Sequence, residues 1–418
     1  MKILYLSYEF PPFHVGGLGT YAMEMTKRFV QKDQSVTTFS KNPGDAPTSE
    51  IWKGVEVHRP QLADMSELLP IIMPHDVADW PTWSQKYFAE VFMYNVLSTT
   101  KSVNDLVGKD DRDFDIVVSH DWLSAIAGIS IKDSLDIPMV FHVHSTEQGR
   151  THQGSETIKR LEKSGAKNAD LVITVSDAMK GHLISLGYEP EKIRAVPNGV
   201  DHEKYDPDRD TFSEDKVRGF REKIGVGDDP MMLYVGRLTW VKGIEPLARS
   251  MPLILEEVPD AKLVVLGVGE QEDSLKDLVD SYDLEENVIT KFEWVSEEER
   301  LMYYAACDLA VFPSRYEPFG IVCTEAMSMG KPVIVGAKGV SGFREQVIAS
   351  GPHRCGSHVD PDSPDDIAKF SIEFLKDKSL RKKLGKNGRE RVLNNYTLDK
   401  VAEQTLEYYR KLVENCNG

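Results

Sequence analysis

Cysteine is scarce in this sequence, and its few cysteines lie far apart. Only Cys307, Cys323, Cys355 and Cys416 occur among the 418 residues, and no two of them form a Cys-x-x-Cys pair. This pattern excludes the cysteine framework of a small, disulfide-stapled scaffold. We therefore expect a reducing, cytoplasmic setting.

Long apolar runs are also absent. No stretch approaches the roughly 20 apolar residues that a transmembrane helix needs, so we expect no integral membrane association. The first ten residues, MKILYLSYEF, combine a basic residue with a short apolar run, as a secretory signal does. Their alternation and the charge of Glu9 instead indicate a buried β-strand.

Positive charge is in deficit. Fifty Lys and Arg residues face sixty-seven Asp and Glu residues, so the formal net charge is -17. Such a surface repels nucleic acid and anionic lipid headgroups, and we expect neither as a partner. A ligand that carries phosphate would need a local positive site. The composition, 41% hydrophobic and 28% charged, is that of an ordinary globular protein.

Short apolar runs alternate with longer stretches of helical period along the chain. This alternation is typical of repeated βα units with parallel sheets. One series precedes the turn residues Val196-Pro197-Asn198-Gly199, and a second follows them. We predict strands within 2–9, 35–40, 115–121, 138–145 and 170–177, and within 231–238, 261–269, 288–294, 308–315 and 331–337.

Two such series in one chain predict two doubly wound α/β domains, over residues 1–200 and 201–395. The last segment, 396–418, has Val401, Leu406, Tyr409 and Leu412 at helical spacing, which predicts an amphipathic helix. Its pattern leaves open whether the helix packs on the second domain or crosses back to the first.

A glycine-rich stretch follows the first strand. Gly16, Gly17 and Gly19 precede a helical run over 20–31. Glycines let a backbone approach a ligand closely, and a helix start offers free N–H groups to a phosphate. The spacing is not the G-x-G-x-x-G of dinucleotide sites, and the second strand ends without an acidic residue. A phosphate site and a tight strand-to-helix turn both remain open.

Two cations follow a predicted strand in the second series. Arg237 and Lys242 lie five positions apart in V-G-R-L-T-W-V-K-G, in a loop that Gly243 helps to shape. In open α/β sheets, ligands bind beyond the carboxyl ends of the strands. The position and the acidic background favour a diphosphate site, with Arg as a fork of donors and Lys as a point charge. The alternative is a pair of solvated surface cations.

Three histidines lie at predicted strand ends in the first series: His120, followed by Asp121, and His142 with His144. Strand side chains alternate, so His142 and His144 point to one face, which raises the question of a metal. No sequence-local metal pattern accompanies them, and we predict no bound metal. We interpret them as hydrogen-bonding groups for a polar ligand, with packed core histidines as the alternative.

The segment R-Y-E-P-F-G-I-V-C-T-E-A-M-S-M-G, 315–330, places two glutamates around a Pro-Phe-Gly. Pro318 extends the backbone of Glu317, Gly320 allows a turn, and a helical pattern follows and ends at Gly330. The N–H groups of Phe319, Gly320 and Ile321 would form the open helix start. Glu317 before it and Glu325 inside it suit a ligand with an anionic middle and hydroxyl-rich ends, such as a sugar nucleotide.

In their order and spacing, these motifs resemble retaining glycosyltransferases of the GT-B type. The likeness is to the large family 4, with features shared by the bacterial and archaeal glycogen synthases of family 5. It covers nearly the whole chain: G-G-L-G, H-D-W and the later histidines, V-P-N-G-V-D, G-R-L-x-x-x-K-G and E-x7-E. The resemblance implies two Rossmann-like domains facing across a cleft, with the acceptor on the first and the nucleotide sugar on the second.

The resemblance also implies individual roles. Gly16, Gly17 and Leu18 would contact the donor phosphates, and Arg237 and Lys242 would bind the diphosphate leaving group. Glu317 would hold the transferred sugar, Phe319 to Ile321 would present N–H groups to donor oxygens, and Glu325 would hold the ribose. His144 matches the family's active-site histidine, with His142 as the competing choice, and His120 and Asp121 would lie at the acceptor or sugar. Retention would proceed without a metal or other cofactor.

The expected reaction is transfer of a hexose, glucose from UDP- or ADP-glucose, to an α-glucan. The alternatives are transfer to a small sugar, sugar phosphate or other metabolite, and, in another class, a nucleotide-sugar epimerase. Aromatic residues within 69–96 would line an acceptor groove or pack as an ordinary helix: Trp80, Trp83, Tyr87, Phe88, Phe92 and Tyr94. The sequence is compatible with a homo-oligomer.

Overall fold

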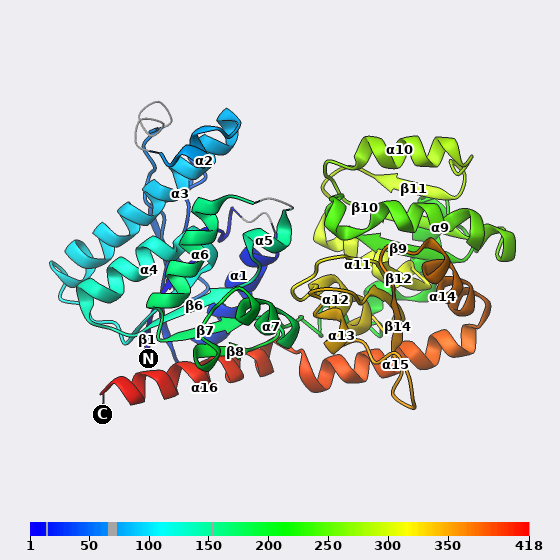
Figure 1. The fold of residues 1–418 in the computed structure, drawn as a ribbon. Helices are drawn as coiled ribbons and strands as arrows, with labels where there is room; N and C mark the ends of the chain where they lie inside the picture. The colour runs from blue at the N-terminus through cyan, green and yellow to red at the C-terminus, as the bar shows by residue number, and fades with distance from the viewer. Residues whose placement is uncertain (14–15, 66–72, 152–153, 418) are drawn as a thin grey trace. The chain divides into compact units, whose positions relative to one another are not determined.

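The computed structural model describes residues 1–13, 16–65, 73–151 and 154–417, and the chain divides into two compact units (Figure 1). The first unit comprises Met1–Asn198 and the segment that begins at Leu398. The second comprises Gly199–Thr397. Both are α/β units built on a mainly parallel sheet, as the alternating pattern predicts.

The first unit contains an eight-stranded sheet in the order β3-β4-β2-β1-β5-β6-β7-β8. The strands are β1 Lys2–Leu6, β2 Ser35–Phe39, β3 Ser49–Trp52, β4 Val55–His58, β5 Ile116–His120, β6 Met139–Val143, β7 Leu171–Thr174 and β8 Ile193–Ala195. All neighbours are parallel except β3 and β4, which form an antiparallel edge. The strands β3, β4 and β8 were not predicted, because they are short and carry few consecutive apolar residues.

Helices flank this sheet. They are α1 Gly17–Gln31, α2 His75–Ala78, α3 Thr82–Thr100, the π-helix η2 Lys101–Val107, α4 Asp121–Leu135, α5 Glu147–Arg150, α6 Glu156–Asn168, α7 Asp177–Ser185, the 3-10 turn η3 Pro190–Lys192 and α16 Leu398–Asn417. The helix α1 begins at Gly17, three residues before the predicted start, so the glycines form its first turn.

The carboxyl-terminal helix α16 is part of the first unit. Its buried side chains Val401, Leu406 and Tyr409 share one apolar cluster with residues of β1 and α1. The ring of Tyr409 lies 5.9 Å from that of Phe29 on α1. Of the two packing arrangements that the sequence left open, the structure shows the second: the C-terminal helix crosses back to the first unit (Figure 1).

The second unit contains a six-stranded, fully parallel sheet in the order β11-β10-β9-β12-β13-β14. The strands are β9 Met231–Val235, β10 Lys262–Leu266, β11 Val288–Lys291, β12 Leu309–Phe312, β13 Val333–Gly336 and β14 Gly356–Val359. The helices are η4 Asp210–Phe212, α8 Glu214–Lys223, η5 Trp240–Lys242, α9 Ile244–Glu257, α10 Glu272–Ser281, α11 Glu297–Ala306, α12 Ile321–Ser328, α13 Phe343–Gln346, α14 Pro364–Lys376 and α15 Lys378–Asn395. The strand β14, Gly-Ser-His-Val, is too polar to be recognised from its pattern.

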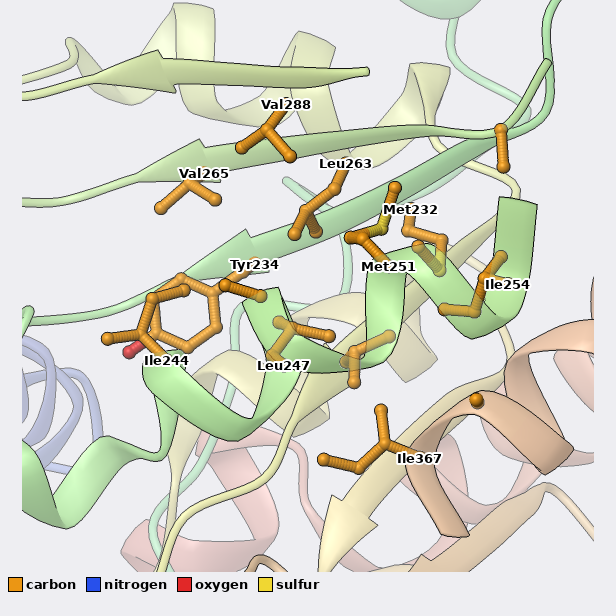
Figure 2. Packing of buried hydrophobic residues seen from close by; sticks show 14 of the residues in the cluster. Met232, Tyr234, Ile244, Leu247, Met251, Ile254, Leu263, Val265, Val288 and Ile367 are labelled. Carbon is orange, nitrogen blue, oxygen red and sulfur yellow. The ribbon is translucent and has the colours of Figure 1, made fainter. Parts of the chain in front are cut away.

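Figure 2 shows how α9 covers one face of this sheet. Its side chains Leu247, Met251 and Ile254 pack toward Met232 and Leu263 of the strands, and all five are fully buried. A fully buried side chain of this size contributes about 1.5–3 kcal/mol of transfer free energy. This packing holds the loop between β9 and α9 against the sheet.

In each unit the strand order reverses at the first strand. The strand β1 has β2 on one side and β5 on the other, and β9 has β10 on one side and β12 on the other. Ligands of open α/β sheets bind beyond the carboxyl ends of the strands at such a switch point. The sheet order therefore predicts that a ligand binds at the loops after β1, β5, β9 and β12.

None of the helices in the described ranges is long and apolar enough to cross a membrane. The cysteines are free thiols: Cys307, Cys323 and Cys355 are buried, and Cys416 is exposed. Their burial shows that three of the four serve as small core side chains.

Candidate active site

In the second unit, the loops after β9 and β12 pack directly on one another. The Arg315 N–H donates to the Val241 carbonyl at 2.8 Å. Gly243 has φ +69°, and a Cβ there would lie 2.0 Å from the Pro313 carbonyl oxygen. Only glycine allows both this backbone conformation and this approach. The two predicted motifs, G-R-L-x-x-x-K-G and E-x7-E, therefore form one surface.

Lys242 and Glu317 meet in that surface. The Lys242 Nζ donates to Glu317 Oε2 at 2.5 Å, and the Ser314 hydroxyl donates to the same oxygen at 3.2 Å. The Glu317 backbone is fixed by its N–H donating to the Val340 carbonyl and by its carbonyl accepting from the Gly342 N–H. Glu317 is only 7% exposed, so the carboxylate is held in one place.

Arg237 lies in the same loop but is exposed to solvent. Within the described part of the chain, no carboxylate approaches its guanidinium within ion-pair distance. Burial raises the pKa of the Tyr234 hydroxyl, at the end of β9. The charge of Glu317 adds to this rise, and the charge of Arg237 opposes it. The predicted diphosphate site thus has one cation bound to Glu317 and one in solvent.

The helix α12 begins directly behind Glu317. Gly320 has φ +89°, and a Cβ at this position would lie 2.1 Å from the Phe343 ring. The chain therefore turns sharply into the helix start, where Gly320 and Ile321 are partly exposed while Phe319 is buried. The amino-terminal end of a helix offers unpaired N–H groups and a positive partial charge, which suit an anion.

Glu325 lies on the second turn of α12, and both of its oxygens accept hydrogen bonds from protein groups. The Tyr205 hydroxyl donates to Oε1 at 2.6 Å, and the Tyr304 hydroxyl donates to Oε2 at 2.8 Å. The Arg300 guanidinium lies 3.7 Å from Oε1. These three residues were not predicted as part of the site, because Tyr205 is 120 positions from Glu325 and no local pattern connects them.

In the first unit, the three histidines form a stack at the carboxyl ends of β5 and β6. Ring centroids are 4.6 Å apart for His120 and His142 and 5.3 Å apart for His120 and His144. The prediction that His142 and His144 share a face agrees with this arrangement, and the register pairs His120 directly with His142. The ring of Tyr21, on α1, lies 4.8 Å from that of His144.

Each imidazole has a hydrogen-bond partner. His120 Nδ1 lies 3.0 Å from His144 Nε2, and His142 Nε2 lies 2.7 Å from the Tyr409 hydroxyl of α16. The Asp121 carboxylate accepts from the His144 backbone N–H at 2.8 Å. Burial lowers the pKa of all three imidazoles, so the stack is neutral near pH 7. His142 is buried whereas His144 is half-buried, which favours His144 as the ligand-facing member.

The stack also bears on the metal question. One ring nitrogen from each histidine lies within 4.8 Å of the other two. A shared ion would require these nitrogens to converge on one point. In the structure, His120 Nδ1 pairs with His144 Nε2, and His142 Nε2 pairs with the Tyr409 hydroxyl. The absence of a bound metal therefore stays a prediction.

The glycine-rich helix start lies next to Glu9, which follows β1. The Gly16 N–H donates to Glu9 Oε2 at 3.1 Å, so this amide is engaged by a carboxylate, which differs from its expected contact with donor phosphate. Gly17 and Leu18 form the first turn of α1 and are partly or fully exposed. His14 and Val15 of the same motif lie outside the described residues. Glu9 was not predicted as a site residue, although its place after the first strand was a signal.

The aromatic residues of the segment 69–96 divide into two groups. Residues 69–72 lie outside the described ranges. Phe88 and Tyr94 are buried, and the Phe88 ring stacks on Trp122 at 6.0 Å, as the packing alternative predicts. Trp83 is 74% exposed, and Tyr87 is 36% exposed with its ring 5.7 Å from that of Tyr8. Tyr87 therefore lies beside a residue that follows β1, and its place in an acceptor groove stays a prediction.

Comparison with known proteins supports the family resemblance that the sequence motifs indicate. Residues 217–391 match the family model for glycosyl transferases group 1, and residues 15–204 match the model for glycosyltransferase family 4. The chain is 33% identical to an uncharacterised glycosyltransferase of Methanocaldococcus jannaschii, over 99% of each chain. It is 26% identical to a glycogen synthase of Mycobacterium tuberculosis, over 98% of this chain and 94% of the relative. It is 27% identical to a D-inositol 3-phosphate glycosyltransferase of Kineococcus radiotolerans, over 96% and 91%.

Among solved structures, the sucrose-phosphate synthase of Thermosynechococcus elongatus matches with a TM-score of 0.77 and 24% identity, over 99% of both chains. At this identity the match is evidence for the fold alone, which is GT-B. The two family models between them account for most of the chain, and the Methanocaldococcus relative is similar along its full length. This chain belongs to the group 1 glycosyltransferases of GT-B fold.

Proposed function

We propose that the chain is a retaining, metal-independent hexosyltransferase that moves glucose from UDP- or ADP-glucose to an α-glucan. The observation that carries the proposal is the group formed by Lys242, Glu317 and the start of α12, at the carboxyl ends of neighbouring strands. A diphosphate needs the cation and the helix start, and a hexose needs the carboxylate. This arrangement suits a sugar nucleotide better than it suits a diphosphate or a hexose alone.

In the proposed reaction, the bond between the anomeric carbon and a diphosphate oxygen breaks. The acceptor oxygen bonds to the same face of that carbon, and the acceptor's hydroxyl proton passes to the departing diphosphate. Negative charge grows on the diphosphate, so Arg237, Lys242 and the N–H groups of α12 stabilise the transition state more than the ground state. These groups take the place that a metal ion holds in other transferases.

Glu317 and His144 would hold the transferred sugar. On binding, Lys242 would shift from Glu317 alone toward the diphosphate, so that the carboxylate can accept hydrogen bonds from sugar hydroxyls. The neutral His144 can donate to a sugar hydroxyl without placing a positive charge beside the oxocarbenium-like carbon. A charged histidine there would oppose the reaction.

The acceptor is proposed from the relatives. The glycogen synthase supports an α-glucan, and the D-inositol 3-phosphate glycosyltransferase supports a small phosphorylated acceptor as the second candidate. Free cysteines in three buried positions fit the proposed cytoplasmic setting. Nucleotide-sugar epimerisation stays the alternative from another class.

A screen of purified protein tests the proposal. UDP-, ADP- and GDP-hexoses are each incubated with glycogen, maltooligosaccharides, glucose 1-phosphate and inositol phosphate, and release of nucleoside diphosphate is measured. We expect release with one donor and an α-glucan, and NMR of the product should show the donor's anomeric configuration. Release only with a phosphorylated small acceptor would select the second candidate. An isomerised nucleotide sugar, or no release at all, would overturn the transferase proposal.

A further inference from the structure

The hydrogen bonds of Glu325 fix its carboxylate but leave some of its acceptor positions open. Each oxygen accepts one phenolic hydrogen bond, from Tyr205 on one side and Tyr304 on the other. A carboxylate has about four acceptor positions, two on each oxygen. One position on each oxygen therefore remains for a ligand, and Glu325 is still 8% exposed.

The two tyrosines are well suited to hold the carboxylate in place. They are almost completely buried, and their rings lie 5.8 Å apart at 70°. Burial raises the pKa of both hydroxyls, so both keep their protons and act as donors. They come from different segments, Tyr205 from the loop after Gly199 and Tyr304 from α11, so together they fix the carboxylate from two directions.

Arg300 completes the arrangement. Its guanidinium lies 3.7 Å from Glu325 Oε1 and donates to the Tyr205 hydroxyl at 3.4 Å. The guanidinium thus lies beside the carboxylate, and its hydrogen bond orients the phenol. A carboxylate with one open acceptor position on each oxygen matches a vicinal diol, which presents two hydroxyl donors at a similar spacing.

We propose that Tyr205 and Tyr304, with Arg300, are positioning residues that aim Glu325 at the 2′,3′-diol of a ribonucleotide and so make the protein select ribonucleotide over deoxyribonucleotide donors. This inference rests on the proposed use of a nucleotide sugar. It goes beyond that proposal because it names the groups that create the ribose selectivity. It also explains why a site residue on a helix has two buried phenols as its partners.

The test is a cycle of two ligands and several variants. Binding of UDP and 2′-deoxy-UDP, and of ADP and 2′-deoxy-ADP, is measured by calorimetry for wild type, Tyr205→Phe and Tyr304→Phe. Loss of a hydrogen bond to a charged acceptor weakens binding on the order of 10-fold or more, so wild type should prefer the ribonucleotide by that factor. Each variant should reduce the preference to about 3-fold or less. Binding of the deoxy ligand should change by less than about 2-fold.

Tyr303→Phe is the matched control. Tyr303 is the neighbour of Tyr304 on α11, is equally buried, and packs its ring against Phe220 at 4.9 Å. This variant should keep the wild-type preference. Glu325→Gln, which retains one acceptor and loses the charge, should lose the preference most.

The outcomes separate the two proposals. If wild type binds neither diphosphate, the proposed use of UDP- or ADP-glucose fails, and this inference fails with it. If wild type prefers the ribonucleotide and both Phe variants keep that preference, only the positioning role is overturned. If the variants weaken ribo and deoxy ligands equally, the tyrosines merely support α11 and α12, which also overturns it. A variant that does not fold is replaced by Arg300→Lys, for which we expect a smaller loss of preference in the same direction.

Discussion

In the first unit the polar cluster is neutral: of three stacked imidazoles, His120 bonds to His144 and His142 bonds to Tyr409. In the second unit the polar cluster is charged: Lys242 pairs with Glu317, and Arg300 lies near Glu325. Both clusters follow the carboxyl ends of parallel strands, so the fold alone does not explain the difference. In the proposed function, the charged groups of the second unit would act on the diphosphate, and the neutral groups of the first on sugar hydroxyls.

The cost of removing a residue should therefore differ between the two clusters. Charged groups that act on a growing negative charge should dominate turnover, whereas buried neutral groups should contribute mainly to stability and orientation.

The largest expected effect is at the cations. Lys242→Ala and Arg237→Ala should each lower kcat by about 100- to 1,000-fold, with a smaller change in KM, because leaving-group charge develops in the transition state. Steady-state kinetics measure both constants. Lys338→Ala, which removes an exposed lysine paired with Asp360 in the same unit, is the control. An unchanged kcat for the exposed Arg237→Ala variant, which leaves no buried charge behind, would refute the role.

A smaller loss is expected at the neutral stack. His144→Ala should reduce kcat on the order of 10-fold, the cost of one neutral hydrogen bond to the reacting sugar. The exposed His353 provides the control variant His353→Ala. If His142→Ala lost more turnover than His144→Ala at equal folded fraction, the assignment of the ligand-facing histidine would have to be reversed.

Stability should respond to the contact between α16 and the stack. Tyr409→Phe leaves the buried His142 without its partner and should lower the free energy of unfolding by about 1–3 kcal/mol, measured by urea denaturation. The neighbouring Tyr408→Phe, on a half-buried side chain, should change it by less than about 0.5 kcal/mol. Equal effects from the two variants would contradict a stabilising role for the hydrogen bond.

The pH dependence of the unfolding free energy should reveal the neutral histidine stack. Burial holds the pKa of His120, His142 and His144 below the ordinary value in the folded state. The unfolded chain then binds more protons as the pH falls below about 6.5, so the unfolding free energy should fall between pH 7 and pH 5. Each histidine contributes at most about 1.4 kcal/mol per pH unit. His142→Phe should reduce this slope relative to wild type, and an identical slope would contradict the depressed pKa.

No effect is expected from a chelator. If Arg237 and Lys242 stabilise the leaving group and the histidines hold no required ion, activity should survive EDTA. Turnover is measured before and after treatment and after addition of Mn²⁺ or Mg²⁺. Loss that either ion restores would overturn the metal-free proposal and would make the histidine stack the first site to examine.

Much of the fold was predictable because its signals are local. The βα alternation located ten of the strands, and the segment from Glu317 to Gly330 predicted a loop, a turn glycine and the helix α12, which the structure contains. The strands β3, β4, β8 and β14 were missed because they have three or four residues each and lack an apolar run. The start of α1 was placed late because glycine is a poor helix former and hides a first turn.

The candidate site was only partly predictable for the same reason. Sequence alone determined which residues follow each strand end, because parallel strands, turn glycines and helix starts depend on neighbours a few positions away. Only the tertiary structure decided that His142 meets Tyr409, 267 positions later, and that Tyr205 meets Glu325. Such contacts depend on the order of strands in the sheet and on the return of α16 to the first unit. No local periodicity carries that information, because the packing of whole elements decides which distant residues become neighbours.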